Sequence, residues 1–324
     1  LRFDVVDIAC VCSIFIFHER NWTYWFIESK TNIANPLYNG KSVAVVSIIW
    51  YSSKSCFKYL SNRNDIILFD DNDSLKNKRN KNYFLNKKKI LNLKFDHIVL
   101  SPGINIKKCK LKNYLNKYKT KIITELDIFN IIYPNNIKIA ITGTNGKSTT
   151  CQMLYNIFKS NNFDTRLVGN IGNSPLLEKK IKEKTIFIVE ASSYQIFYSK
   201  YFKADHSAIL NLSPDHLDRH RNINEYAKAK LKLIYNQENK KQSYIEKNNK
   251  IINKNISINK IKSKINKLNY NKYEFFKKKI KNIYLLDKNN LNNIHFIYSI
   301  CKKFKLSDNQ IFNSLNKFKG LKYR

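Results

Sequence analysis

The residues best suited to chemistry lie in one short stretch, Thr142–Thr149, which reads Thr-Gly-Thr-Asn-Gly-Lys-Ser-Thr. Its two glycines allow a turn whose backbone N–H groups point inward at an anion, and Lys147 adds a full positive charge. The hydroxyl of Ser148 or Thr149 would hold the Mg²⁺ that accompanies a nucleotide. These residue types therefore predict a cradle for the phosphates of a nucleoside triphosphate.

The segments on either side of this stretch predict the elements that would hold the cradle in place. Apolar residues alternate over 137–141, as in a buried strand, and recur with helical spacing over 153–158. The spacing differs from that of the common P-loop, because Ile141 stands where that loop has its first glycine. The alternative interpretation is an ordinary strand-to-helix turn that carries Gly-Lys-Ser by chance.

Glycine usage supports the phosphate-binding interpretation. The chain has only 7 glycines in 324 residues, well below the usual share of ~7%. Four of them lie in two short turns, Gly143/Gly146 and Gly169/Gly172. A chain that uses glycine so rarely is expected to place it where φ is positive or where two backbones approach closely.

Residues 41–134 predict a first unit of the α/β class, with the Rossmann-like alternation of strands and helices. Its second strand ends in Asp70, about twenty residues past the first turn, where nucleotide-sugar and dinucleotide domains place a carboxylate. The first turn, 47–52, contains no glycine, so the phosphate-binding fingerprint itself is absent. The predicted strands cover 42–47, 65–71, 97–101 and 121–125, and the predicted helices cover 53–60 and a segment from Leu111.

Residues 135–318 predict a second α/β unit, a P-loop-type ATPase domain with a mainly parallel sheet around the phosphate cradle. Residues 1–40 fit no pattern and stay unassigned, and 237–281 predict only loops and short edge strands. The other predicted elements are strands at 165–169, 185–190 and 206–211, and helices at 224–234, 289–304 and 307–318.

Two of these strands end in residues that could bind a metal ion or a phosphate. Both 185–190 and 206–211 are nearly continuous apolar runs, which are typical of buried parallel strands. The first ends in Glu190, and the second is followed by a Ser-Pro-Asp-His sequence that contains His216. The carboxyl ends of parallel strands are where open α/β sheets hold their ligands. The alternative for each residue alone is a solvated side chain.

The composition argues against several classes of protein. The formal net charge is +35, but the lysines are scattered and come with many Asn, Ile, Tyr and Phe. This combination is typical of a bias toward A+T-rich codons, so it predicts a solvated basic surface rather than a nucleic-acid groove. The six cysteines form no Cys-x-x-Cys pair, which predicts reduced thiols in a cytoplasmic protein. No apolar run approaches the ~20 residues that would span a membrane.

Several strings in the sequence resemble, in order, the motifs of the Mur ligase family over roughly residues 41–324. The strings are Ser101–Ile104, Thr142–Thr149, Gly169–Gly172, Glu190–Gln195, Asn211–His220, Tyr226–Lys230 and Phe318–Arg324. The Ser-Ser-Tyr-Gln and Ser-Pro-Asp-His-Leu-Asp-Arg-His forms are most similar to the member that adds D-glutamate. The nearest alternatives are the sister ligases that add a diamino acid or add glutamate to folate. A non-catalytic nucleotide-binding remnant is the competing class.

The resemblance implies an ATP-dependent amide ligase of peptidoglycan precursor synthesis, a cytoplasmic process on which the cell wall, cell shape and cell division depend. In this reaction ATP phosphorylates the alanine carboxylate of UDP-N-acetylmuramoyl-L-alanine, and the amine of D-glutamate attacks the acyl phosphate. Such a transfer needs neutralisation of charge more than acid–base catalysis. We expect a monomer that uses ATP and Mg²⁺ and binds neither nucleic acid nor a membrane.

Residue by residue, the resemblance implies four catalytic groups and their neighbours. Lys147 would bind the β- and γ-phosphates, and Ser148 and Glu190 would hold one Mg²⁺. His216 would hold a second metal ion with Lys230, which in this family is carbamylated and so becomes an oxygen ligand. The implied ATP-binding residues are Gly143, Thr144, Asn145, Gly146, Lys147, Ser148, Thr149, Asn290, Asn293 and Arg324. The implied substrate-binding residues are Asp70, Ser101, Pro102 and Gly103 at the uridine diphosphate end, together with Asn170, Ser192 and Gln195.

The sequence departs from the family in two further places. Asn289 stands where the family has a histidine before Asn290, and the chain reaches only the start of the family's third domain, at 319–324. In the family that domain supplies the site for the amino acid and closes over ATP. We therefore expect the 324-residue chain to be an incomplete ligase, either a fragment or the product of a decaying gene, that does not complete the ligation alone.

Overall fold

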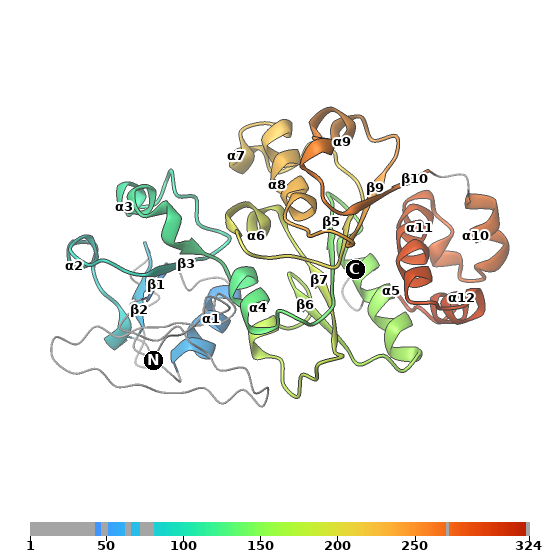
Figure 1. The fold of residues 1–324 in the computed structure, drawn as a ribbon, viewed down its shortest axis with the longest axis horizontal. Helices are drawn as coiled ribbons and strands as arrows, with labels where there is room; N and C mark the ends of the chain where they lie inside the picture. The colour runs from blue at the N-terminus through green and yellow to red at the C-terminus, as the bar shows by residue number, and fades with distance from the viewer. Residues whose placement is uncertain (1–42, 47–50, 62–65, 72–80, 270–271, 322–324) are drawn as a thin grey trace. The chain divides into compact units, whose positions relative to one another are not determined.

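The structure, a computed structural model, describes residues 43–46, 51–61, 66–71, 81–269 and 272–321. These residues divide into two compact units of the α/β class (Figure 1). Unit 1 extends to Pro134 and also takes in two short later segments, Ser174–Leu177 and Tyr198–Phe202. Unit 2 contains the other residues from Asn135 onward.

Three features singled out in the sequence lie outside the described residues: the unassigned stretch 1–40, most of the first turn at 47–50, and Arg324. Among the helices that the structure does describe, none is long and apolar enough to cross a membrane. The four cysteines in the described part of the chain are buried and free, as the composition predicts; they are Cys56, Cys109, Cys151 and Cys301.

Unit 1 contains four strands, β1 (Val43–Val46), β2 (Ile67–Phe69), β3 (His97–Leu100) and β4 (Ile122–Ile123). Its helices are α1 (Tyr51–Ser61), α2 (Lys87–Leu91), α3 (Lys112–Lys117) and α4 (Glu125–Ile132), with single turns of 3-10 helix at Lys81–Tyr83, Lys119–Lys121 and Pro175–Leu177. The strands form one sheet in the order β2-β1-β3-β4, and every neighbouring pair is parallel. The predicted Rossmann-like alternation is confirmed.

The predicted strand at 121–125 is wrong in its second half, because α4 begins at Glu125, directly after the short β4. A capping box starts that helix: the Asp127 N–H donates to Thr124 Oγ1 at 3.4 Å, and the Thr124 N–H donates to Asp127 Oδ2 at 2.8 Å. The other carboxylate oxygen of Asp127 accepts from Ser199 Oγ at 2.7 Å and from the next three backbone N–H groups. This buried aspartate therefore fixes both the start of α4 and a later segment of unit 1.

Unit 2 contains the strands β5 (Lys138–Thr142), β6 (Thr165–Gly169), β7 (Ile186–Glu190), β8 (His206–Ile209), β9 (Gln242–Glu246) and β10 (Lys264–Leu268). Its helices are α5 (Lys147–Ser160), α6 (Ser193–Tyr198), α7 (Leu217–His220), α8 (Ile223–Tyr235), α9 (Lys250–Asn255), α10 (Tyr273–Lys279), α11 (Lys288–Lys303) and α12 (Asp308–Asn316). Single turns of 3-10 helix lie at Ile258–Lys260 and Ile283–Leu285.

The six strands form one parallel sheet in the order β10-β9-β8-β5-β7-β6. The strand that precedes the predicted phosphate cradle, β5, lies between β7 and β8 at the centre of this sheet. Open α/β sheets bind their ligands at the carboxyl end of such a position, where the winding of the chain changes direction. The sheet order thus brings Glu190, at the end of β7, next to the cradle.

Helices cover both faces of this sheet (Figure 1). Near the end of β8, Ala208 and Leu210 join the large core that contains residues of α5, α11 and α12, whereas Ile209 joins a smaller core with α8 and α9. The alternation follows from the period of two in a strand. Every residue of β5 and β7 is buried, since a parallel strand covered on both faces has no solvent side.

The prediction of only loops and short edge strands for 237–281 is wrong in part. This segment supplies β9 and β10 together with α9 and α10, and β9 lies inside the sheet rather than at its edge. β9 is difficult to recognise in the sequence because it contains polar residues at buried positions. Ser243 is fully buried, yet its Oγ lies 2.5 Å from Gln237 Oε1 and 2.6 Å from Ser263 Oγ. A buried but hydrogen-bonded serine interrupts the apolar run that would identify a parallel strand.

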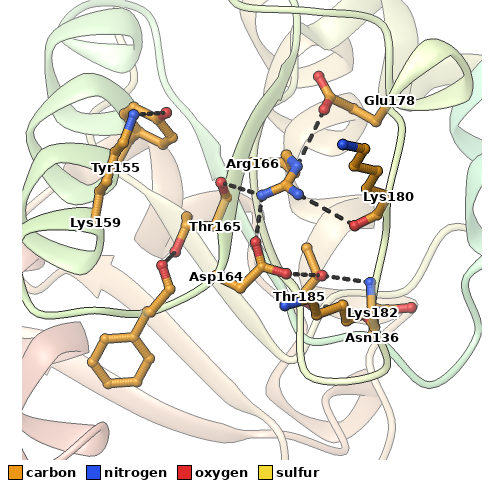
Figure 2. A network of polar contacts seen from close by, with 11 residues as sticks. Asn136, Tyr155, Lys159, Asp164, Thr165, Arg166, Glu178, Lys180, Lys182 and Thr185 are labelled. Atoms are coloured by element: carbon orange, nitrogen blue, oxygen red, sulfur yellow. Dashed lines mark hydrogen bonds and ion pairs between the residues drawn. The ribbon is translucent and has the colours of Figure 1, made fainter.

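A polar network fixes the connection between β6 and β7 (Figure 2). Arg166 lies between two carboxylates, with its Nη1 2.5 Å from Asp164 Oδ1 and its Nε 3.3 Å from Glu178 Oε2. The other oxygen of Asp164 accepts from Thr185 Oγ1 at 2.5 Å, one residue before β7. Glu178 also accepts from Asn173 Nδ2 at 2.8 Å, just after the second glycine turn. The network therefore joins the start of β7 to the turn that follows β6.

Candidate functional site

The glycine-rich loop between β5 and α5 has positive φ and close contacts where the sequence predicts them. Gly146 has φ +80°, in the left-handed region, and α5 begins at the next residue. A Cβ at Gly146 would lie 2.6 Å from Asn293 Nδ2, and a Cβ at Gly143 would lie 3.1 Å from Leu210 Cβ. The first turn of α5 adds backbone N–H groups that have no partner inside the helix. Loop and helix start together form the type of turn that binds phosphate.

Two lysines converge on this loop. Lys147 Nζ donates to the carbonyl oxygens of Gly143, at 2.9 Å, and Thr144, at 2.8 Å. Lys230 reaches the same loop from α8, and its Nζ donates to Gly143 O at 2.8 Å and to Thr142 Oγ1 at 3.3 Å. The structure therefore brings together the two lysines that the resemblance places among the catalytic groups.

The surroundings of Lys230 disfavour its charged form. The side chain is only 1% exposed, and its Nζ lies 4.6 Å from the ring centre of Tyr226. Burial, and then the charge of Lys147, lower the pKa of Lys230 well below its usual value, whereas Asp215 and Glu190 act in the opposite direction. Lys230 is therefore held as a neutral amine far more readily than a surface lysine.

Glu190 lies on the strand next to the loop, opposite Ile141 in the β5–β7 register. Its carboxylate is buried, and Oε1 accepts from Asn170 Nδ2 at 2.9 Å. The Asn170 N–H also donates to the Glu190 carbonyl oxygen at 2.9 Å. The second carboxylate oxygen, Oε2, is buried and has no hydrogen-bond partner. Such an oxygen is costly to bury, and a cation bound to it would remove that cost.

The residues near the loop fit a magnesium ion that is shared with a nucleotide. In the described part of the chain, no three His, Cys, Asp or Glu side chains form a group that could hold a metal ion. Mg²⁺ at a nucleotide needs fewer protein ligands, because it takes one or two of them and completes its shell with phosphate oxygens and water. Glu190 Oε2 and the hydroxyl of Ser148, a buried residue in the first turn of α5, are suitable donors.

His216 occupies an uncommon backbone conformation. Its φ is +52° at the residue before α7, and its exposed Nε2 lies 3.4 Å from Asp215 Oδ2. The ring centre lies 5.0 Å from that of Tyr194 and 6.2 Å from that of Tyr226. Non-glycine residues in left-handed backbone concentrate at functional sites. The role of His216 as a metal ligand stays a prediction.

Three of the predicted binding residues hydrogen-bond to their own neighbours. The N–H and the Oγ of Ser192 donate to Gln195 Oε1, each at 3.0 Å, at the start of α6. Asn290 Nδ2 donates to Tyr284 O at 2.9 Å and to Asp287 Oδ2 at 2.5 Å, at the start of α11. These bonds stabilise the first turns of the two helices. The ligand roles of the three residues stay predictions.

The predicted uridine diphosphate residues belong to unit 1. Asp70 and Ser101 follow β2 and β3, whose ends flank that of β1, and both side chains are buried. Pro102 and Gly103 form a turn that the Ile104 N–H closes on Ser101 O at 3.1 Å. Ser101 Oγ is buried without a hydrogen-bond partner, so a ligand at this edge of the sheet could satisfy it.

Three residues contact the loop although the sequence assigns them no role. Asn211 Oδ1 accepts from the Asn145 N–H at 2.9 Å, and Thr144 Oγ1 lies 3.2 Å from Ser213 O and 3.3 Å from Tyr226 OH. Two of the three follow β8, and β8 pairs with β5 in the sheet. The signals in the sequence are the place of Asn211 and Ser213 after a predicted parallel strand, and the place of all three residues in strings that resemble Mur ligase motifs. That Asn211 and Ser213 contact the loop follows only from the order of the strands, which places β8 beside β5.

Comparison with known proteins places these residues in a family. The profile of the Mur ligase middle domain matches residues 141–310. A relative from Rickettsia prowazekii, named UDP-N-acetylmuramoylalanine--D-glutamate ligase, is 31% identical over 83% of this chain and 65% of its own length. A relative of the same name from Francisella tularensis subsp. novicida is 35% identical over 71% of this chain and 54% of its own length. The chain thus spans less than two thirds of these relatives.

Solved structures share the fold. The UDP-N-acetylmuramate:L-alanyl-gamma-D-glutamyl-meso-diaminopimelate ligase from Neisseria meningitides matches 87% of this chain and 99% of its own with a TM-score of 0.58 and 11% identity. A murein peptide ligase from Psychrobacter arcticus matches 87% of this chain and 69% of its own with a TM-score of 0.52 and 13% identity. At these identities the match concerns the fold alone. The profile match, however, covers more than half of the chain and includes the glycine-rich loop, Glu190 and Lys230, so this chain belongs to the Mur ligase family.

Proposed function

We propose that this chain works in an ATP-dependent ligase that joins D-glutamate to UDP-N-acetylmuramoyl-L-alanine in peptidoglycan precursor synthesis. The observation that carries the proposal is the arrangement around Gly143. The Nζ atoms of Lys147 and Lys230 both donate to its carbonyl oxygen, and the neighbouring strand ends at Glu190. The names of the relatives supply the amino acid and its acceptor. The same proposal places the protein in the cytoplasm as a monomer.

The loop would serve to activate a carboxylate. A carboxylate resists attack by an amine until one of its oxygens belongs to a phosphate leaving group. The alanine carboxylate would take the γ-phosphoryl group with release of ADP, and the amine of D-glutamate would then attack the acyl carbon with release of phosphate. Lys147 and the first turn of α5 would hold the phosphates and offset the charge that develops during the transfer.

Glu190 and Ser148 would hold the magnesium ion of the nucleotide. Mg²⁺ supplies positive charge that neutralises the phosphate oxygens during transfer. The chain contributes the orientation of the ligand: Asn170 Nδ2 donates to Glu190 Oε1 at 2.9 Å and leaves Oε2 without a protein partner. A hydrogen bond of this type fixes the carboxylate and raises the affinity of its second oxygen for a cation.

Lys230 would act as a metal ligand after a covalent change. We propose that its neutral amine adds CO₂ and loses a proton, which forms a carbamate with two oxygen donors. The burial of the side chain supports this, because burial beside Lys147 disfavours the ammonium form. His216 would share with the carbamate the binding of a second cation. An unmodified ammonium group at this position could not bind a cation at all.

The proposal is tested by the dependence of ADP release on the acceptor and the amino acid. The protein is incubated with Mg-ATP and UDP-N-acetylmuramoyl-L-alanine, with or without D-glutamate, and the Lys147→Ala variant is the control. We expect release of ADP that requires the alanine-bearing acceptor and disappears in the variant. Greater turnover with the acceptor of a sister ligase, or with a diamino acid, would identify that ligase instead. No acceptor-dependent release under any condition would favour a non-catalytic nucleotide-binding protein.

A further inference from the structure

Asn211 joins the phosphate loop to the sheet through both its backbone and its side chain. It lies two residues after the end of β8, where the hydrogen-bond ladder between β8 and β5 runs out. The Leu210 N–H still donates to Thr142 O at 2.9 Å, and the Thr144 N–H donates to Asn211 O at 3.1 Å. Asn211 is therefore the last residue after β8 whose backbone pairs with the segment that continues β5 into the loop.

The side-chain amide of Asn211 then continues the ladder by one more step. Its Oδ1 accepts from the Asn145 N–H at 2.9 Å, and its Nδ2 donates to Asn145 O at 3.0 Å. The amide thus makes with Asn145 the pair of bonds that two residues exchange in a hydrogen-bonded pair of an antiparallel sheet. Both partners in Asn145 are backbone atoms, whereas the side chain of Asn145 is exposed.

These two bonds also fix the next peptide group. In a trans peptide the C=O and the following N–H point in opposite directions. A bond from Asn211 to Asn145 O therefore turns the Gly146 N–H away from β8. Gly146 has φ +80°, and a left-handed residue in such a turn directs successive N–H groups toward one point, which makes an anion site.

A second contact acts on the residue before. Thr144 Oγ1 donates to Ser213 O at 3.2 Å and accepts from the Ser213 N–H at 3.1 Å. The first half of the loop is consequently fixed at two successive residues, and its second half continues into α5. The bonds of Thr144 and Asn145 thus fix the path of the loop from β5 toward α5.

We propose that Asn211 is a positioning residue for phosphate binding, which sets the direction of the loop N–H groups by holding both sides of the Asn145 peptide. The ligand would be the phosphate chain of a nucleoside triphosphate, so the functional part of this inference rests on the proposed function. Asn211 itself does not touch the phosphates. Its effect is transmitted through Asn145 and Gly146.

The inference is tested by comparing Asn211→Ala with a matched control, Asn249→Ala. Asn249 Nδ2 donates to Leu212 O at 3.3 Å, next to Asn211, and Asn249 Oδ1 caps α9 through the Ile252 N–H at 3.1 Å. Both variants lose an asparagine amide at the same edge of the sheet. Hydrogen exchange of the hydrogen-bonded amides of Thr144 and Asn145 is measured without nucleotide, and the affinity for Mg-ATP is measured by calorimetry.

We expect Asn211→Ala to accelerate exchange at Thr144 and Asn145 and to weaken Mg-ATP binding by about 5- to 30-fold each, the effect of one or two neutral hydrogen bonds. Asn249→Ala should leave both quantities at the parental level even if its melting temperature falls. Asn211→Asp keeps the acceptor for the Asn145 N–H but loses the donor to Asn145 O, so exchange should rise by an intermediate amount. This variant replaces the alanine variant in the test if the latter does not fold.

Unchanged exchange at Thr144 and Asn145 in the Asn211 variants, or an equal rise in Asn249→Ala, would overturn the inference. The exchange measurement is made without nucleotide, so it judges the positioning role separately from ATP binding. If the parent protein bound no Mg-ATP, the proposed function would fail, whereas faster loop exchange in Asn211→Ala would still establish that this residue holds the loop.

Discussion

The Nζ atoms of Lys147 and Lys230 donate to the same acceptor, the carbonyl oxygen of Gly143, at 2.9 and 2.8 Å. Two cationic groups are thereby held together, and only one of them can easily keep its charge in a buried site. Lys230 is the lysine that loses its charge more readily, because burial and the charge of Lys147 both lower its pKa. The two lysines are therefore suited to different tasks, one as a fixed charge for phosphates and the other as a reactive amine.

Replacement of Lys147 by alanine should weaken the binding of Mg-ATP. The variant loses the positive side chain of the loop, and hydrogen bonds to charged groups contribute about 1.5–3 kcal/mol each, so the expected loss is about 10- to 100-fold in affinity. Calorimetry provides the measurement. Lys159→Ala is the control, since Lys159 lies at the other end of α5 with its Nζ 3.1 Å from Tyr155 OH. Equal affinities in the parent and in Lys147→Ala would contradict the assignment of the loop.

Lys230 should carry a carbamate when CO₂ is available. With ¹³C-labelled bicarbonate, NMR of the parent protein should show a carbamate carbon that is absent from Lys230→Arg. Lys228→Arg is the matched control, because Lys228 lies on the same helix but is exposed and pairs with Glu225 at 3.4 Å. The signal should persist in that variant. A parent spectrum without the signal, or a signal that survives in Lys230→Arg, would contradict the covalent change.

The strand, the glycine loop and the helix of the site could be predicted from the sequence because their signals are local. Alternating apolar residues, two rare glycines and a helical repeat all lie within 137–158. The capping signal at Thr124 is equally local, but a strand interpretation of 121–125 concealed it. By contrast, the short helix α6 has no repeat long enough to identify it.

The contacts that complete the site could not be predicted, because they depend on which strands are neighbours. Asn211 reaches Asn145 only because β8 pairs with β5, and the chain between them includes two other strands. Lys230 could be singled out by resemblance but not from its residue type, since Lys228 and Lys232 flank it and lysine is abundant throughout. Its burial became evident only from the packing of α8 against the loop.

Gly146→Ala should destabilise the protein more than Gly320→Ala, although both glycines have φ +80°. An L residue in left-handed backbone costs about 1–2 kcal/mol, so both variants should lose that much. Among the described residues, a Cβ at Gly320 would meet only Tyr284, at 3.9 Å, whereas a Cβ at Gly146 would lie 2.6 Å from Asn293 Nδ2. Overpacking of that kind adds about 1–3 kcal/mol. Urea unfolding of both variants measures the difference, and equal losses would show that Asn293 moves aside freely.

Glu125 should make unit 1 less stable as the pH rises. Burial raises the pKa of this carboxyl from 4.5 to about 7, against the hydrogen bonds from Ser174 and Ser55, which are 2.5 and 2.6 Å long. Between these two values the folded state binds more protons than the unfolded state, so stability falls as the pH increases. The contribution lost by pH 8 is roughly 3 kcal/mol.

Glu125→Gln removes this titration while it keeps an acceptor for both hydroxyls. The variant should therefore gain stability relative to the parent at pH 8 and much less at pH 5, as measured by urea unfolding at both values. Glu274→Gln is the control, because the Glu274 side chain is 77% exposed and should shift neither value. A difference between Glu125→Gln and the parent that does not change with pH would contradict the raised pKa of Glu125.

The transfer of oxygen from the acceptor to phosphate tests the central claim most directly. UDP-N-acetylmuramoyl-L-alanine labelled with ¹⁸O in its alanine carboxylate is incubated with the protein, Mg-ATP and D-glutamate, and the released phosphate is analysed by mass spectrometry. If the site around Gly143 activates the carboxylate as an acyl phosphate, one ¹⁸O atom should appear in the phosphate, and Lys147→Ala should abolish that signal. If the parent protein releases phosphate that carries no ¹⁸O, it hydrolyses ATP without activating the acceptor. That result would contradict the account.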